Sequence, residues 1–212
     1  MDLVIKLYLD TADRTAAEPL LATGLFAGLT TNPAILRRAG LGVDAVPEIY
    51  RWATGAGARE VFFQAWGDDL VGTGRELREM GKEVVVKFAA SIEGSAACAT
   101  LARETPTLLT AVYNPGQALI AAAAGATYVA PYLGRMTDAG RDGLSDVIAM
   151  QEVLRDTATK ILLASIRDVP SMVTLARHGV ECFTFGPSVA AQFFDDELTA
   201  SAVVEFEEAV RG

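Results

Sequence analysis

The segment Glu83-Val84-Val85-Val86-Lys87-Phe88-Ala89 combines a run of three valines with a single lysine. Because β-branched side chains pack well on a pleated sheet, the valine run predicts a strand that is buried on both faces. A lysine at the end of such a strand is expected to lose much of its hydration, which lowers its pKa. The segment therefore predicts a parallel α/β fold and a lysine that could act as a nucleophile.

The chain has 212 residues, of which 51% are apolar and 21% are charged. This length and composition fit one compact domain over residues 1–212 better than two. The net charge of -9 argues against binding to nucleic acid or to an anionic membrane, because both select basic surfaces. Any anionic ligand must therefore meet a local cluster of basic side chains.

The two cysteines, Cys98 and Cys182, lie far apart in the sequence and form neither a disulfide framework nor a metal-ligand pair. We therefore expect a reducing, cytoplasmic location and no metal site. Residues 1–6 are too short and too acidic for a signal peptide, and no apolar run approaches the roughly 18 residues of a transmembrane helix. The single histidine, His178, gives little support to a multi-histidine site.

Short apolar runs alternate with helical stretches along the whole chain, and no linker interrupts them. The predicted strands are residues 6–10, 27–31, 61–65, 84–88, 107–111, 128–131, 160–165 and 182–185. The clearest predicted helices are residues 70–80, 92–103, 115–124, 144–157, 172–178 and a terminal helix at about 200–211. This alternation predicts a (β/α)8 TIM barrel. An open doubly wound sheet is the competing fold, but its usual glycine-rich first turn is absent from Asp10-Thr11-Ala12-Asp13.

Polar residues follow the predicted strands at the end where the strands of a barrel converge on one mouth. They are Asp10, Thr30, Thr31, Asn32, Gln64, Lys87, Thr110, Tyr132, Arg135, Ser165, Arg167 and, beside Gly186 after the last strand, Ser188. Taken singly, each is more readily a helix cap or a solvated loop residue. A lysine, a carboxylate, a phenol and two guanidinium groups at one mouth exceed what capping requires, so the set predicts an active site.

These side chains suit covalent catalysis through an imine. A neutral Lys87 amine would add to a ketone and lose water, and the iminium would stabilise a carbanion at the neighbouring carbon. Asp10 and Tyr132 are the candidate acid and base groups, and Thr110 and Gln64 are candidates for positioning a water molecule. The predicted reaction is cleavage or formation of a carbon–carbon bond.

Two arginines supply the predicted anion site. Arg135 and Arg167, on consecutive strands of the barrel, would clamp a phosphate at the far end of a sugar. The alternative is that each is an ordinary surface ion-pair partner, and for Arg167 the adjacent Asp168 favours that alternative.

Six segments resemble the transaldolase family and, more closely, its small branch, the fructose-6-phosphate aldolases. The resemblance runs through essentially the whole chain in the same order. The segments are Leu7-Tyr8-Leu9-Asp10-Thr11-Ala12-Asp13, Gly28-Leu29-Thr30-Thr31-Asn32-Pro33, Val85-Val86-Lys87, Thr110-Ala111-Val112-Tyr113, Val129-Ala130-Pro131-Tyr132 and Leu163-Ala164-Ser165-Ile166-Arg167.

The resemblance implies a class I aldolase barrel that forms a Schiff base between Lys87 and a dihydroxyacetone unit, without metal or organic cofactor. It implies an acid/base role for Asp10, substrate binding by Asn32, and a catalytic water beside Thr110. Thr31, which precedes Asn32 at the same strand end, is a further candidate for substrate binding. Phosphate binding would fall to Arg135, Ser165 and Arg167. A ring-shaped homo-oligomer, a pentamer or decamer to which the terminal helix contributes, is also implied.

Two positions bear on the type of reaction. Transaldolases proper usually have Glu at the position of Gln64 and Phe at the position of Tyr132, so this pair is aldolase-like. A glutamate could take a proton itself, whereas glutamine can only orient a water molecule. A transaldolase that transfers dihydroxyacetone between sugars is the alternative.

The chain also departs from the family at residues that we expect next to the substrate. It has Phe88-Ala89 where the family commonly has Val-Pro or Ile-Pro, Ala34 in place of a serine, and a bulky Trp66. These departures leave open a modified sugar or another anionic head group, such as a sulfonate.

Two further functions remain open. A sugar phosphate isomerase needs a strong base such as Glu or His at the mouth, which the strand ends do not supply. A non-catalytic sugar phosphate binding protein would use the arginines but leave Lys87 unexplained.

Overall fold

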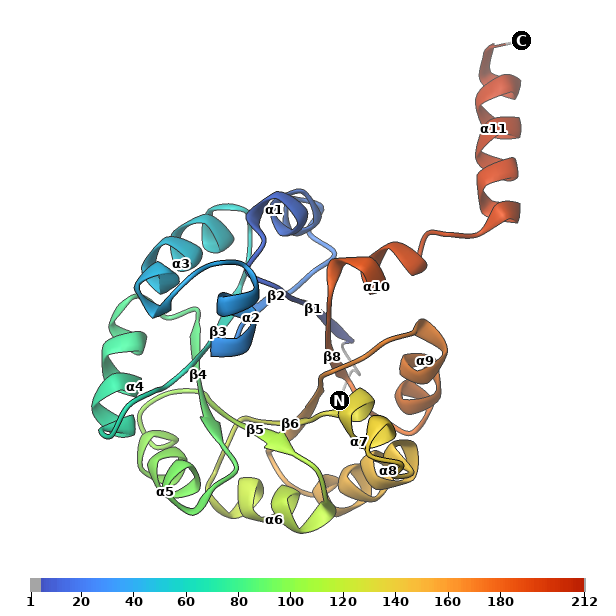
Figure 1. The fold of residues 1–212 in the computed structure, drawn as a ribbon. Coiled ribbons are helices and arrows are strands. Elements are labelled where there is room, and N and C mark those ends of the chain that lie inside the picture. Colours follow the sequence, from blue (N-terminus) through green and yellow to red (C-terminus); the bar gives the residue numbers. More distant parts are fainter. Residues whose placement is uncertain (1–4, 212) are drawn as a thin grey trace.

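The computed structural model describes residues 5–211. Its eight parallel strands close into a barrel in chain order, with the last strand paired to the first (Figure 1). The strands are β1 Lys6–Asp10, β2 Gly28–Thr30, β3 Glu60–Gln64, β4 Val84–Ala89, β5 Thr107–Val112, β6 Tyr128–Pro131, β7 Lys160–Leu163 and β8 Cys182–Phe185. The predicted TIM barrel is confirmed.

Helices surround the barrel and connect its strands (Figure 1). They are α1 Arg14–Ala22, α2 Pro33–Arg38, the 3-10 helix η1 Val43–Ala45, α3 Val46–Gly55, α4 Leu70–Glu79, α5 Ile92–Leu101, α6 Pro115–Ala123, α7 Leu133–Asp138, α8 Gly143–Leu154, α9 Val169–Arg177, α10 Pro187–Gln192 and α11 Glu197–Arg211. The clearest predicted helices therefore exist, with ends displaced by a few residues.

The largest error in a predicted strand is at β7, which ends at Leu163 and not at Ser165. Ser165 has a φ of 58°, a left-handed conformation that departs from the extended backbone of β7. Only an isolated bridge between Tyr132 and Ala164 continues the pairing beyond β7. Ser165 therefore lies in the loop that follows the strand, at the barrel mouth.

The hydrophobic core has two parts, one inside the barrel and one between the barrel and its helices. Inside, the Phe62 ring packs edge-to-face against Tyr8 and Tyr128, with ring centroids 5.3 and 5.4 Å away. Gly28 permits close packing of β2 on β3, because a Cβ atom there would lie 1.8 Å from the Glu60 carbonyl oxygen. These contacts fill the barrel below the mouth.

Polar groups close the opposite end of the barrel, which we call the floor: Lys6, Tyr8, Glu60 and Tyr128. Lys6 and the two tyrosine hydroxyls all donate to the Glu60 carboxylate, at 3.0 Å for Lys6, 2.5 Å for Tyr8 and 2.8 Å for Tyr128. The floor therefore pairs its charges internally.

The last helix, α11, extends away from the barrel (Figure 1). None of its residues is buried, and its apolar side chains Leu198, Val203, Phe206 and Val210 are exposed. The predicted helix at 200–211 is thus present and begins three residues earlier, without packing on the barrel of its own chain. Within residues 5–211, no helix is both long and apolar enough to cross a bilayer.

Candidate active site

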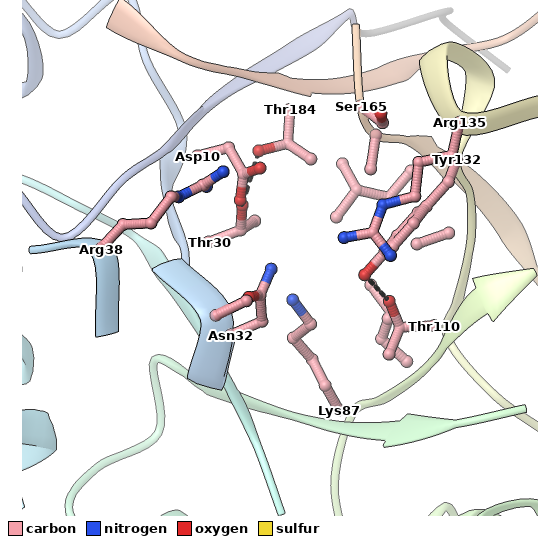
Figure 2. Close-up of a pocket in the computed structure, with 15 residues that line it drawn as sticks. Asp10, Thr30, Asn32, Arg38, Lys87, Thr110, Tyr132, Arg135, Ser165 and Thr184 are labelled. Atoms are coloured by element: carbon pink, nitrogen blue, oxygen red, sulfur yellow. Dashed lines mark hydrogen bonds between the residues drawn. The ribbon is translucent and has the colours of Figure 1, made fainter. Parts of the chain in front are cut away.

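A cavity of about 180 Å³ lies at the carboxyl ends of the strands, at the mouth of the barrel (Figure 2). The predicted site residues that line it are Asp10, Asn32, Lys87, Thr110, Tyr132, Arg135 and Ser165. Thr30, another of the predicted strand-end residues, and Ala34, which we expected next to the substrate, also line it. Arg38 and Thr184 line it as well and were not among the predicted residues. The structure therefore brings most of the predicted set together.

Lys87 projects from β4 into this cavity and is only 5% exposed. Its Nζ atom donates a hydrogen bond to the Thr31 carbonyl oxygen at 2.6 Å. Burial lowers the Lys87 pKa to about 8, although the Asp10 charge acts in the opposite direction. Roughly a tenth of the Lys87 amine is then neutral at pH 7, against well under a thousandth for a solvated lysine.

Thr31 contributes its backbone rather than its side chain to the site. The Thr31 hydroxyl donates to the Phe62 carbonyl oxygen at 3.3 Å, and Thr31 does not line the cavity. Thr30, the preceding residue, faces the cavity instead. Alternation along β2 accounts for this difference, because successive side chains point to opposite faces of a strand.

A chain of three polar groups crosses β1, β2 and β8. The Thr30 hydroxyl donates to Asp10 at 2.6 Å and lies 2.6 Å from the Thr184 hydroxyl. Since Thr30 has one proton, Thr184 is the donor in that second bond. Burial raises the Asp10 pKa, while Lys87, Thr30, Arg38 and Arg135 all act to lower it. Asp10 is therefore a buried carboxyl group beside an amine, suited to exchanging a proton.

Tyr132 and Thr110 form a second polar pair, with their hydroxyl oxygens 2.8 Å apart. Burial raises the Tyr132 pKa, so its phenol is protonated at neutral pH. The Arg135 guanidinium lies over the Tyr132 ring, 4.8 Å from its centroid. This pair faces Asp10 across the cavity in Figure 2.

Asn32 is fixed by the helix that it begins. Its side-chain oxygen accepts a hydrogen bond from the Ile35 backbone N–H at 3.0 Å and caps α2. The amide nitrogen remains for the cavity, where it can donate to a substrate oxygen. Ala34, two residues after Asn32, also lines the cavity.

Arg135 and Ser165 lie together because α7 packs closely on the loop after β7. A Cβ atom at Gly134 would lie 2.5 Å from the Ser165 carbonyl oxygen, so only glycine fits there without displacement. Arg135 follows directly and reaches the cavity.

Arg167 does not line the cavity, although the resemblance implies a phosphate contact for it. Its guanidinium donates to Asp138 at the surface, while the adjacent Asp168 caps α9 through the Ser171 N–H at 2.8 Å. The surface ion pair that the sequence left open for Arg167 is present, but its partner is Asp138 and not Asp168.

Gln64 pairs in register with Lys87 between β3 and β4. Gln64 is among the residues that line a separate cavity of about 10 Å³, together with Trp66 and Asn32, and it does not line the Lys87 cavity. Phe88, another expected neighbour of the substrate, is buried in the core between barrel and helices. Of the departures from the family pattern, Ala34 is therefore the one that reaches the Lys87 cavity.

No group of three His, Cys, Asp or Glu side chains within residues 5–211 is arranged to hold a metal ion. The cavity instead offers an amine, a carboxyl group, a phenol and guanidinium groups. Fold and cavity together define a TIM-barrel protein whose mouth holds a buried amine, an arrangement suited to imine chemistry.

The chain belongs to the Transaldolase/Fructose-6-phosphate aldolase family, whose model matches residues 7–211. A protein named "Probable transaldolase" from Nitrosopumilus maritimus (strain SCM1) is 33% identical over 207 residues, covering 95% of this chain and 93% of that protein. Another of the same name, from Anaeromyxobacter dehalogenans (strain 2CP-C), is 34% identical over 206 residues, covering 95% and 94%. The protein is thus an enzyme of the transaldolase family.

Solved structures of mandelate oxidase share the fold. One matches with a TM-score of 0.61 and 14% identity, covering 86% of this chain and 64% of that one. Another matches with a TM-score of 0.63 and 13% identity, covering 85% and 64%. At this identity the likeness concerns the barrel alone.

Proposed function

We propose that the protein is a Schiff-base (class I) aldolase that cleaves or forms a carbon–carbon bond of a ketose phosphate such as fructose 6-phosphate. The observation that carries the proposal is the Lys87 amine, which is buried in the cavity with a pKa lowered to about 8. Family membership supports the same chemistry.

In the cleavage direction, the neutral Lys87 amine adds to the C2 carbonyl of the open-chain sugar. The carbinolamine takes up one proton and loses water, which leaves an iminium ion at C2. Asp10 then removes the proton of the C4 hydroxyl. The C3–C4 bond breaks, C4 leaves as an aldehyde, and the electron pair neutralises the iminium as an enamine.

The fate of this enamine separates the two reactions of the family. Protonation at C3 by the Tyr132–Thr110 pair, followed by hydrolysis, releases dihydroxyacetone and gives an aldolase. Attack of the enamine on a second aldehyde gives a transaldolase, the alternative that the names of the relatives favour. Free dihydroxyacetone that accumulates without an aldehyde acceptor would identify the aldolase.

Gln64 gives a further test of the balance between transfer of the three-carbon unit and release of free dihydroxyacetone. On the role that the resemblance implies, Gln64→Glu should raise transfer relative to release of free dihydroxyacetone, because a carboxylate can take the proton itself. The ratio is measured with and without glyceraldehyde 3-phosphate. An unchanged ratio would agree with the place of Gln64 in the separate cavity and remove its assigned role.

The anionic head group is proposed to be a phosphate, and a sulfonated or otherwise modified sugar is the alternative that Ala34 keeps open. A sugar phosphate binding protein without catalysis is the second alternative. A binding protein has no need of the buried Lys87 amine beside the buried Asp10 carboxyl group, and burying these two groups lowers folding stability.

Trapping tests the proposal directly. The protein is incubated with dihydroxyacetone or fructose 6-phosphate, reduced with borohydride and digested, and the adduct is located by mass spectrometry. A ligand-dependent adduct on Lys87 is expected. Absence of that adduct, under conditions that trap a known class I aldolase, would overturn the proposal.

We also propose a cytoplasmic homo-oligomer, a pentamer or decamer, in which α11 docks on a neighbouring copy. The exposed apolar side chains of α11 support this assembly. Sedimentation of the full chain should give a multiple of 22.4 kDa, and a chain ending before α11 should give a smaller species.

A further inference from the structure

Arg38 is a basic residue of the cavity that the strand-end pattern did not reveal. It is the last residue of α2, and its side chain extends toward Asp10 in Figure 2. Arg38 follows β2 and Arg135 follows β6, and these strands lie four positions apart either way around the closed barrel. The two arginines therefore approach the cavity from opposite sides.

The end of α2 does not need the Arg38 side chain as a cap. Backbone N–H groups already satisfy the last carbonyls: Leu41 donates to Leu36 at 2.9 Å, and Gly40 donates to Arg37 at 3.1 Å. Within residues 5–211, no carboxylate oxygen lies within 4.0 Å of the Arg38 guanidinium. Its charge is thus available at the mouth.

The charges of Arg38 and Arg135 converge on the same region, since both act to lower the pKa of Asp10. Arg167, by contrast, is neutralised by Asp138 outside the cavity. Ala34 lies one helical turn before Arg38 and also lines the cavity. Ala34 and Arg38 therefore lie on the same side of α2, which faces the cavity.

We propose that Arg38 and Arg135 hold the outer anionic group of the substrate between them, which makes Arg38 a specificity-determining residue for the aldehyde half. The deep wall of the cavity includes Leu108 and Leu162, which offer no partner for an anion. The three-carbon unit bound to Lys87 therefore lies deep, and the phosphate or sulfonate lies at the rim. This inference rests on the proposed aldolase chemistry.

The test compares two acceptors in the synthesis direction, with dihydroxyacetone as donor. D-glyceraldehyde 3-phosphate carries the anionic group, and D-glyceraldehyde lacks it. Arg38→Gln should lower kcat/KM for the phosphorylated acceptor by about 10- to 100-fold, mostly through KM, as expected for loss of a charge-assisted hydrogen bond. It should change kcat/KM for D-glyceraldehyde by less than about threefold.

Arg37→Gln is the matched control, because Arg37 is an exposed arginine in the same helical turn that does not line the cavity. It should leave both acceptors unchanged. Arg38→Lys should recover part of the lost kcat/KM, since it restores the positive charge but not the planar guanidinium group that can donate two hydrogen bonds to one anion. Equal effects of Arg38→Gln on both acceptors, or a phosphate-specific loss in Arg167→Gln alone, would overturn the proposal.

A binding measurement separates this inference from the aldolase proposal. Calorimetry with inorganic phosphate should show weaker binding by Arg38→Gln than by the wild type and Arg37→Gln. The role of Arg38 requires this weaker phosphate binding whether or not dihydroxyacetone forms an adduct on Lys87. A missing adduct would overturn only the aldolase chemistry. Equal phosphate affinity of all three proteins would overturn the role of Arg38.

Discussion

Lys6 and Lys87 lie at opposite ends of the same barrel and differ in what surrounds them. Burial alone would lower the Lys6 pKa, but hydrogen bonds and charges from Glu60 and Tyr128 outweigh it and raise the pKa. Lys87 donates to a neutral carbonyl oxygen, and burial lowers its pKa to about 8. The presence of a bonded carboxylate, and not the residue type, decides which lysine has a raised pKa and which a lowered one.

The two ends of the barrel differ in how their polar groups are paired. The floor pairs Lys6 with Glu60 and both tyrosines, so its polar groups close the barrel. The mouth keeps Lys87 close enough to Asp10 for their charges to interact, without a direct salt bridge between them. Substitutions at the floor should therefore change stability, and substitutions at the mouth should change chemistry.

The largest expected effect is that of Lys87→Met, which removes the proposed nucleophile while keeping much of its apolar volume. Aldol cleavage should fall by at least about a thousandfold. Lys6→Met is the matched control and should keep near-normal kcat at a temperature below its melting point. If the two variants lost similar activity, the assignment of Lys87 as nucleophile would be wrong.

The pH dependence of stability should differ in sign between the two lysines. With a folded pKa near 8 and an ordinary value of 10.5, unfolding takes up protons between these pH values, so the stability linked to Lys87 rises with pH there. The wild type should gain about 3 kcal/mol relative to Lys87→Met between pH 7 and 10.5. Below pH 8 the wild type bears nearly the full free-energy cost of burying the charged Lys87 amine.

Urea denaturation of the wild type and of each methionine variant checks this sign. The raised Lys6 pKa gives the opposite dependence: its stabilisation is complete below pH 10.5 and is lost only above that value. A constant difference between wild type and Lys87→Met from pH 7 to 10 would refute the low pKa.

Asp10→Asn should lower kcat by about a hundredfold, because the amide cannot exchange the C4 hydroxyl proton. The same change removes the charge that raises the Lys87 pKa. The midpoint of the pH profile for borohydride trapping should therefore move to lower pH. A midpoint that stays fixed or rises would show that the Asp10 charge does not act on the amine.

The smallest expected effect is at the floor. Tyr8→Phe removes the hydrogen bond to Glu60 and should cost about 1 kcal/mol, which lowers Tm by about 2–4 °C for a chain of this size. Activity measured well below Tm should be unchanged. Thermal unfolding and a kcat assay on the same sample decide between a structural and a catalytic role for the floor.

Much of the barrel could be predicted from local sequence because each strand is a short apolar run bounded by turns. The bounds of β1, β6 and β8 match the prediction. The error at β7 arose because residues 160–165 have the composition of a strand. The left-handed backbone of Ser165 lies against Gly134, a residue from another part of the chain, and local composition does not reveal such a contact.

The site was predictable where a candidate side chain lies at or just after the carboxyl end of a strand, as with Asp10, Lys87 and Tyr132. Thr184 could have been found by alternation along β8, since it precedes Gly186 by two residues. Arg38 could not, because it ends a helix and reaches the mouth only through the path of α2. The partner of Arg167 was hidden for a similar reason, as Asp138 comes from another helix.

Peptide-resolved borohydride trapping with dihydroxyacetone, repeated from pH 6 to 11, measures whether burial activates the Lys87 amine. The yield of adduct on Lys87 should rise with pH to a midpoint near 8, and Lys6 should form no ligand-dependent adduct. A Lys87 midpoint at or above 10.5, or an adduct on Lys6 at comparable yield, would contradict the account of an amine activated by burial.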